Sequence, residues 1–286
     1  MIESFISSWA LFQDSYLAGW LMAIVLAMTG VTVVARNQIF IGAAVSQAST
    51  LGIALAMWAG SFIVSQDEHH GESHGVATVM AVLFSVVAAW ITAGGRDRGG
   101  ESREAVTGWV FLFSSSVAIL IVSSSPMGLE EVQRLLSSSI IGATRHDVYG
   151  FGALAVCTAM ALAFARERLT LVLVDPVMAE SVGLRIGRWN AGLSIWLGLT
   201  IGLSIHSSGM LFTFGCLTLP GLIAKNICRE IRPMFWVAPL VALAASVLGF
   251  MIANQGDLPP AQMTVALLCG LHVVAWGTRS LHLTRA

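Results

Sequence analysis

The chain of 286 residues is 56% hydrophobic and 11% charged, with a mean hydropathy of +0.80. A soluble globular domain carries roughly 25% charged residues, so this composition excludes that class and indicates an integral membrane protein. The formal net charge of −1 gives no basic footprint for a nucleic acid.

Nine segments are long and apolar enough to be candidate membrane spans, since a span needs about 20 mostly apolar residues. They are residues 17–35, 41–64, 76–94, 105–123, 148–165, 189–207, 209–226, 232–253 and 262–279. The second is polar in its first half, and the sixth and seventh are separated only by "HSSG", so eight or ten spans also stay open. We expect an all-α, polytopic transmembrane bundle of about eight or nine spans, forming one domain over residues 1–286.

The basic residues predict the orientation of these spans. With the N-terminus outside, 13 of the 15 lie on the inner side: Arg36, Arg96, Arg98, Arg103, Arg166, Arg168, Arg185, Arg188, Lys225, Arg229, Arg232, Arg279 and Arg285. Such a bias is typical of cytoplasmic segments. The segment around residue 180 is therefore expected in the cytoplasm, and the loop 66–75 outside.

The loop "QDEHHGESHG" at 66–75 combines three histidines with three acidic residues. Imidazoles and carboxylates at this density can collect a metal ion, which makes His69, His70 and His74 candidate metal contacts. Glycines within the stretch favour a flexible external loop over a rigid site. The alternative is a hydrophilic connector whose histidines are incidental.

Polar side chains interrupt two of the predicted spans. Ser46, Gln47, Ser49 and Thr50 make the first half of the second span polar, so this face should meet protein or a cavity. Small polar residues are also common at helix contacts. Because Gln47 is large and needs partners, we place Ser46, Gln47 and Thr50 near a translocation path.

In the seventh span, Pro220 removes a backbone hydrogen bond. A kinked helix that lines a path and a kink made for packing are both consistent with this residue. If the helix lines a path, Cys216 and Thr218 also face it. Separately, "GLTIG" at 198–202 is a GxxxG pattern that would allow two spans to pack closely.

The stretch "LVLVDPVMAESVGLRIGRWNAG", residues 171–192, turns polar between two spans. Asp175 followed by Pro176 is a helix-start signal, and Gly183 can adopt the left-handed conformation that ends a helix. Between them lie about two turns with a small apolar surface and the charge of Glu180. Such a helix suits docking into a groove of a soluble partner, or lying on lipid as an interfacial helix.

Three stretches resemble the permeases of metal-type ABC transporters, the membrane subunits of zinc, manganese and iron importers. "DPVMAESVGL" is similar to their cytoplasmic coupling helix, with Asp175, Pro176, Ala179 and Gly183 in register. "GMLFTFGCLTLPGLIAKNI" at 209–227 and "VARNQIFIGAAVSQASTLGIALA" at 34–56 resemble two further family segments in the expected order. The resemblance implies that residues 175–184, including Glu180, couple this chain to an ATPase.

One departure from the family concerns the second span. There the family offers an Asp and a His one helical turn apart, a pair that suits a transition metal. Ala43 and Gln47 occupy these positions here, and Leu51 replaces a proline. Three interpretations stay open: a different cargo, the degenerate half of a mixed permease pair, or a differently built ion path.

The resemblance implies the permease of a bacterial inner-membrane ABC importer, with a divalent metal such as zinc, manganese or iron as cargo. Its expected partners are two cytoplasmic ATPase subunits, an external binding protein and a second permease, identical or related. We expect no enzyme activity and no bound cofactor, because the chain has no Walker A pattern and ATP would be used by the partner. Rival functions are import of a non-metal solute, a stand-alone secondary transporter and a membrane scaffold.

Overall fold

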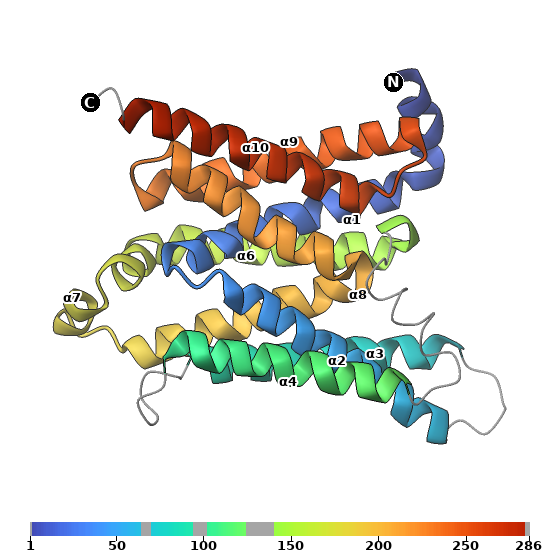
Figure 1. The fold of residues 1–286 in the computed structure, drawn as a ribbon, viewed down its shortest axis with the longest axis horizontal. Helices are drawn as coiled ribbons and strands as arrows, with labels where there is room; N and C mark the ends of the chain where they lie inside the picture. Colours follow the sequence, from blue (N-terminus) through green and yellow to red (C-terminus); the bar gives the residue numbers. More distant parts are fainter. Residues whose placement is uncertain (1, 64–69, 94–101, 124–139, 284–286) are drawn as a thin grey trace. The chain divides into compact units, whose positions relative to one another are not determined.

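The computed structural model describes residues 2–63, 70–93, 102–123 and 140–283 (Figure 1). Within these ranges the chain is helical and holds no strand, and eight helices are long and apolar enough to cross a membrane. The prediction of an all-α, polytopic bundle is therefore confirmed. The helices are α1 (Ile2–Ala35), α2 (Phe40–Ile63), α3 (His70–Ala93), α4 (Arg103–Ser123), the short 3₁₀ turn η1 (Ile140–Gly142), α6 (Arg145–Val174), α7 (Pro176–Ser181), α8 (Ile186–Ile227), α9 (Ile231–Gly256) and α10 (Pro260–Leu283).

The sixth and seventh predicted spans both lie in α8, which has 42 residues. Its backbone leaves the helical conformation at Gly209, where φ is 79° and ψ is 170°. Segments 186–208 and 210–227 on either side are each close to the length that one span requires. Pro220 also lies within α8, yet the non-helical residue of this helix is Gly209.

Several helices are longer than hydropathy predicted, among them α1, which begins at Ile2 and not at residue 17. The fifth predicted span ended at residue 165, whereas α6 continues through Arg166, Glu167 and Arg168 to Val174. Charged residues of this kind are good helix formers, so polarity alone does not end a helix. Likewise α3 begins at His70, so residues 70–75 are helical and not a loop as expected.

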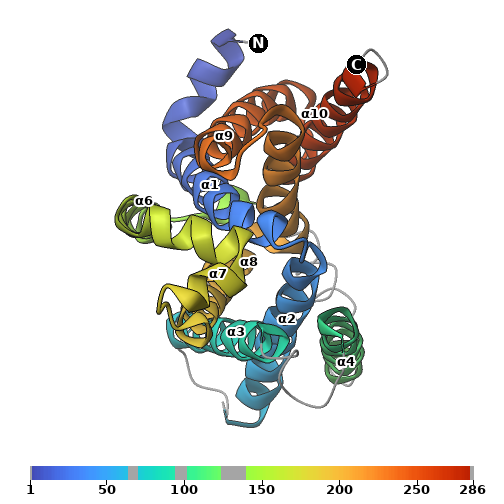
Figure 2. The same ribbon diagram turned by 90° about the vertical axis from the view of Figure 1, so that its left-hand side faces the viewer.

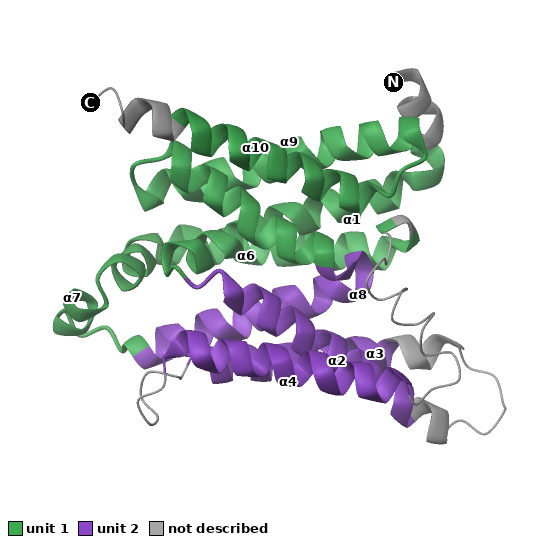
Figure 3. Ribbon diagram, in the orientation of Figure 1, with its two compact units in different colours: residues 1–37, 139–186, 211–286 green, residues 38–138, 187–210 purple. Residues whose placement is uncertain are grey.

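The chain divides into two compact units (Figure 3). Unit 1 comprises residues 1–37, 139–186 and 211–286, and unit 2 comprises residues 38–138 and 187–210. In unit 1, α1 packs on α6 and α9, and α9 also contacts α10 (Figure 2). A close backbone approach joins α1 to the second segment of α8, because a methyl group at Gly30 would collide with the carbonyl of Leu217.

In unit 2, α2 packs against both α3 and α4. Leu51 and Ala54 of α2 form a small apolar core with Ala118 and Val122 of α4. The first segment of α8 lies against α3, where a methyl group at Gly198 would come within 2.5 Å of Val86 Cα. The predicted role of the GxxxG pattern in close packing is thus confirmed.

Candidate functional site

The polar helix predicted between two spans is α7, and its start is capped as the sequence indicated. The Asp175 carboxylate oxygen Oδ1 accepts a hydrogen bond of 2.9 Å from the backbone amide of Met178. Pro176 occupies the first helical position, where its missing N–H costs no helical bond. The negative charge of the exposed Asp175 also interacts favourably with the positive, amino-terminal end of the helix dipole.

The end of α7 is fixed by a pair of backbone hydrogen bonds. The amide of Gly183 donates to the Glu180 carbonyl at 2.9 Å, and the amide of Leu184 donates to the Ala179 carbonyl at 3.0 Å. This pairing is a Schellman motif, which requires a left-handed residue at its turn. Gly183 supplies that conformation with φ +88°, as predicted.

Ala179 is the one residue of the predicted docking helix that is buried in the structure. Ala179 has no exposed surface, so it holds α7 against the rest of unit 1 and cannot touch a docked partner directly. Exposed apolar area comes instead from Val177, Met178 and Val182, of which Met178 is 55% exposed. Glu180 is exposed as well. The helix therefore offers an apolar patch with one acidic group.

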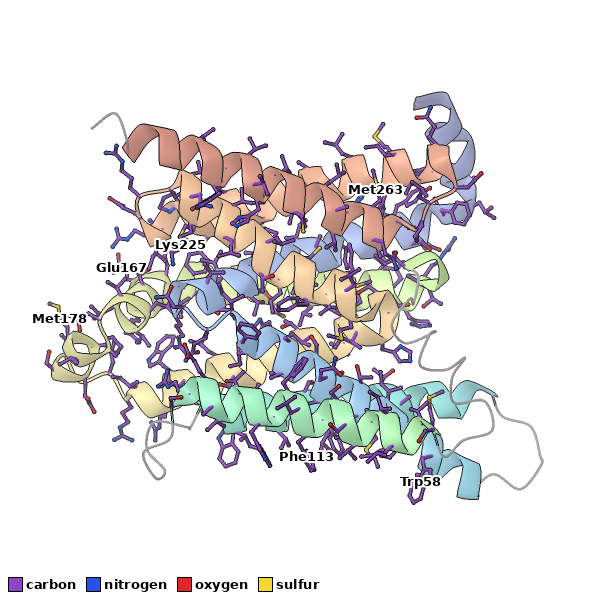
Figure 4. The ribbon with its side chains drawn as sticks, in the orientation of Figure 1. Trp58, Phe113, Glu167, Met178, Lys225 and Met263 are labelled. Atoms are coloured by element: carbon purple, nitrogen blue, oxygen red, sulfur yellow. The ribbon has the colours of Figure 1, made fainter. Side chains whose placement is uncertain are left out.

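The extension of α6 places α7 beyond the predicted end of its span at residue 165. Residues 145–165 of α6 measure about 31 Å at 1.5 Å per residue, which matches the hydrocarbon core of a bilayer. Residues 166–174 add about 13 Å more, beginning with the exposed Arg166, Glu167 and Arg168. Figure 4 shows Glu167 and Lys225 at one end of unit 1, with Met178 of α7 beyond them.

Exposed basic residues of unit 1 gather at that same end. The carboxyl ends of α6 and α8 and the amino end of α9 meet there (Figure 1), and they carry Arg166, Arg168, Lys225, Arg229 and Arg232. Lys225 donates a hydrogen bond of 2.8 Å to the side chain of Asn37. At the opposite end, the exposed Arg145 pairs with Asp14 at 3.4 Å. Unit 1 is therefore asymmetric in charge along its helices.

Two serines of the polar stretch on α2, the predicted path residue Ser46 and its neighbour Ser49, lack hydrogen-bond partners within the described residues. Ser46 and Ser49 are fully buried on α2, and neither hydroxyl has a hydrogen-bond partner within the described residues. Ser204 on α8 has the same property. Unpaired buried hydroxyls are uncommon in proteins and often mark a place for water or a ligand.

Gln47 and Thr50 are satisfied in different ways. The Gln47 side chain donates from Nε2 to the sulfur of Met210 at 3.1 Å, which links α2 to α8 within unit 2. Thr50 bonds to the Ser46 carbonyl of its own helix. Sequence reasoning did not identify Met210 as the partner of Gln47, because no local pattern connects residues 163 positions apart.

The remaining predicted path residues lie in unit 1, on the second segment of α8. Cys216 is fully buried, and the Thr218 hydroxyl bonds to the Phe214 carbonyl at 2.9 Å. Beside Pro220, a methyl group at Gly221 would lie 2.9 Å from a methyl of Val34 on α1. These contacts are those of helix packing inside unit 1, and the position of these residues on a translocation path stays a prediction.

The structure thus brings the five coupling residues together in α7 and its caps, whereas the path residues divide between the two units. For the predicted metal contacts, His69 lies outside the described residues, and so do the side chains of His70 and His74 at the start of α3. Among the described residues, no group of three or more His, Cys, Asp or Glu side chains could hold a metal ion.

Comparison with known proteins finds relatives that are similar over most of the chain. The chelated iron transport system membrane protein YfeD of Yersinia pestis is 27% identical over 246 residues, which is 86% of this chain and 77% of that protein. The manganese import system permease protein ScaB of Streptococcus gordonii is 22% identical over 256 residues, 88% of this chain and 86% of that protein.

A solved structure, described as PsaBC from Streptococcus pneumoniae in complex with Fab, has a similar fold. The TM-score is 0.78 at 18% identity, with 96% of this chain and 95% of that chain covered. The model of the ABC 3 transport family matches residues 8–278. The chain is therefore a multi-pass membrane protein that belongs to the ABC 3 transport family.

Proposed function

We propose that the chain is the permease subunit of an ATP-driven importer that carries a divalent metal cation across a bacterial inner membrane. A separate cytoplasmic ATPase would bind at α7, and its closure would switch the permease between outward-open and inward-open states. An external binding protein would deliver the cargo. The pore would need a second permease, either a copy of this chain or a related one.

The observation that carries the coupling role is the construction of α7. This helix has six residues and is capped at both ends, so its geometry does not depend on the bilayer. It exposes Val177, Met178 and Val182 beside Glu180, and it follows an α6 that extends about 13 Å beyond the expected span. A helix lying on lipid would turn its apolar face to the membrane at the point where the span ends. A helix projecting beyond that point suits a protein groove.

The cytoplasmic position of α7 is supported by charge. The end of unit 1 that carries α7 also carries five exposed basic residues on α6, α8, α9 and the connection between α8 and α9. Cytoplasmic ends of membrane helices are enriched in Lys and Arg. We therefore place the α7 end inside, and the N-terminal part of α1 outside with Arg145 and Asp14.

The proposal that the cargo is a metal rests on the relatives of the chain, which are named for iron and manganese transport. The family that the sequence resembles also includes zinc importers. Ala43 and Gln47 replace the carboxylate and imidazole expected on α2, so this copy would supply neutral groups, with charged ligands coming from a related partner permease. On this account the acidic, histidine-rich segment 66–75 would meet the metal first, outside the membrane.

The experiment is reconstitution of the chain in proteoliposomes with an ATPase, a binding protein and a second permease encoded beside its gene. We expect uptake of iron, manganese or zinc that requires ATP and stops when the ATPase cannot hydrolyse it. Uptake that proceeds without the ATPase and follows an ion gradient would instead establish a secondary transporter. ATP-dependent uptake of a non-metal solute with no metal uptake would keep the permease role and overturn the cargo.

A further inference from the structure

Gly209 interrupts α8 with a backbone conformation that the other amino acids avoid. Its φ of 79° and ψ of 170° fall in a region populated essentially by glycine. The division between the two units falls in the same place, because unit 2 ends at Met210 and unit 1 resumes at Leu211 (Figure 3). The break in α8 therefore coincides with a boundary between two separately packed bodies.

Each segment of α8 is held tightly by its own unit. In the first segment, methyl groups at Gly198 and Gly202 would lie 2.5 Å and 2.7 Å from backbone atoms of α3. The Ser85 hydroxyl adds a hydrogen bond of 2.6 Å to the Gly198 carbonyl. Such close approaches leave a helix little freedom to slide on its neighbour, so this segment must move with unit 2.

The second segment is held equally closely by unit 1. The backbone at Leu217 lies directly against Gly30 of α1, and a methyl group at Gly215 would come within 2.7 Å of Val265 on α10. This segment must move with unit 1. Any reorientation of the units then requires a change of backbone angles between the two segments, where Gly209 lies.

The residue after the break makes a contact that can open and close at low cost. Met210 accepts a hydrogen bond from Gln47 on α2, and a thioether is a weak acceptor. Both side chains are neutral and half-buried. The contact therefore ties Met210, the first residue after the break, to α2 without a charge that would resist its separation.

We propose that Gly209 is the pivot about which the two units reorient, and that the Gln47–Met210 contact holds the pivot in one of its two settings. The driving force, closure of a bound ATPase, rests on the proposed function. The pivot itself rests on the backbone of α8 and on the two sets of helix contacts. Hinge closure of rigid bodies about a few backbone positions is a common form of conformational change.

The test is a distance distribution between spin labels on the two segments of α8. Labels are placed at Ile195→Cys and Ile227→Cys, two exposed positions, in a chain whose native cysteines are alanine. Measured in lipid nanodiscs without any partner, the parent should give two distances. Gly209→Ala should leave one distance, because alanine resists the backbone angles of the break.

One further test variant and two control variants complete the design. Met210→Leu keeps the volume but removes the sulfur acceptor, so it should change the proportions of the two distances while keeping both. Met263→Leu on α10 and Gly192→Ala, a helical glycine with open space around it, should reproduce the parent. If Gly209→Ala does not fold, the comparison of the distance proportions in Met210→Leu and Met263→Leu still decides whether the contact at Met210 holds the pivot.

One narrow distance in the parent, unchanged by Met210→Leu, would mean that Gly209 is a fixed kink and would overturn the proposal. Two distances that persist in Gly209→Ala would place the pivot elsewhere and overturn it too. Addition of the ATPase with a non-hydrolysable ATP analogue should shift the proportions in the parent. If the ATPase binds without any shift, the pivot has no part in transport. If the ATPase does not bind, the coupling function fails, while the distances in the chain alone still decide the pivot.

Discussion

Asp175 is at once the C-cap of α6 and the N-cap of α7, because its amide donates to the Leu171 carbonyl and its carboxylate accepts from the Met178 amide. One residue therefore sets both where the long helix stops and how the short helix leaves it. This relationship lets the movement of α7 be passed directly to α6, without a flexible linker between them.

Removal of this cap should uncouple the two helices. Asp175→Ala loses the acceptor for the Met178 amide, which typically costs about 1 kcal/mol, a large amount for a helix of six residues. We expect less ATPase to co-purify with the variant at unchanged membrane level. Asp175→Asn keeps an acceptor oxygen and should restore most of the binding. Equal recovery of ATPase with Asp175→Ala would show that the cap is not needed for docking.

The stop of α7 should be equally sensitive to backbone conformation. Gly183→Val places a β-branched residue at φ +88°, which disrupts the Schellman turn and redirects the chain towards α8. We expect reduced metal-stimulated ATP hydrolysis in liposomes. Asn tolerates this conformation best among the other residues, so Gly183→Asn should retain more activity. Equal rates of metal-stimulated ATP hydrolysis for Gly183→Val and Gly183→Asn would contradict the role of the left-handed conformation in this turn.

Helix packing in unit 1 gives a prediction about stability alone. A methyl group at Gly30 would overlap the Leu217 carbonyl, so Gly30→Ala should destabilise the protein by about 1–3 kcal/mol. Gly150 lies in α6 with open space around it, and Gly150→Ala should leave stability equal or slightly higher. Thermal unfolding in detergent compares the two. Equal melting temperatures would contradict the close approach of α1 and α8.

Orientation can be tested with single cysteines at the two ends of unit 1. In a chain without native cysteines, Glu167→Cys should be protected from an impermeant maleimide in intact cells, and Leu258→Cys, at an exposed position after α9, should be labelled. Permeabilised cells should label both. The reverse pattern would place α7 outside and remove the basis for ATPase docking there.

Much of the architecture follows from the sequence, because hydropathy and capping are local properties. The caps at Asp175 and Gly183 were predicted from residue chemistry, and the membrane helices from apolar length. Hydropathy missed the continuation of α6 through Arg166–Arg168, where helical propensity outweighs polarity.

Features that depend on distant residues were not predictable in the same way. The boundary between the sixth and seventh predicted spans coincides with the break at Gly209, whereas Pro220, which was expected to interrupt the helix as well, is not a non-helical residue, since the structure around a proline can keep a helix intact. The burial of Ala179 and the pairing of Gln47 with Met210 arise from tertiary contacts, which no local pattern encodes.

The central claim, that α7 docks an ATPase, is tested most directly by the affinity of the ATPase for charge-reversed variants in nanodiscs. Glu180→Arg reverses the acidic group on the exposed face of α7 and leaves Asp175 and Gly183, the residues of both caps, in place, whereas Glu167→Arg makes the same change on α6. We expect Glu180→Arg to weaken binding about tenfold or more, which is about 1.4 kcal/mol, because it places a mismatched charge in the interface. Glu167→Arg should bind like the parent. Equal affinity of the parent and Glu180→Arg would contradict the claim, as would a loss caused by Glu167→Arg alone.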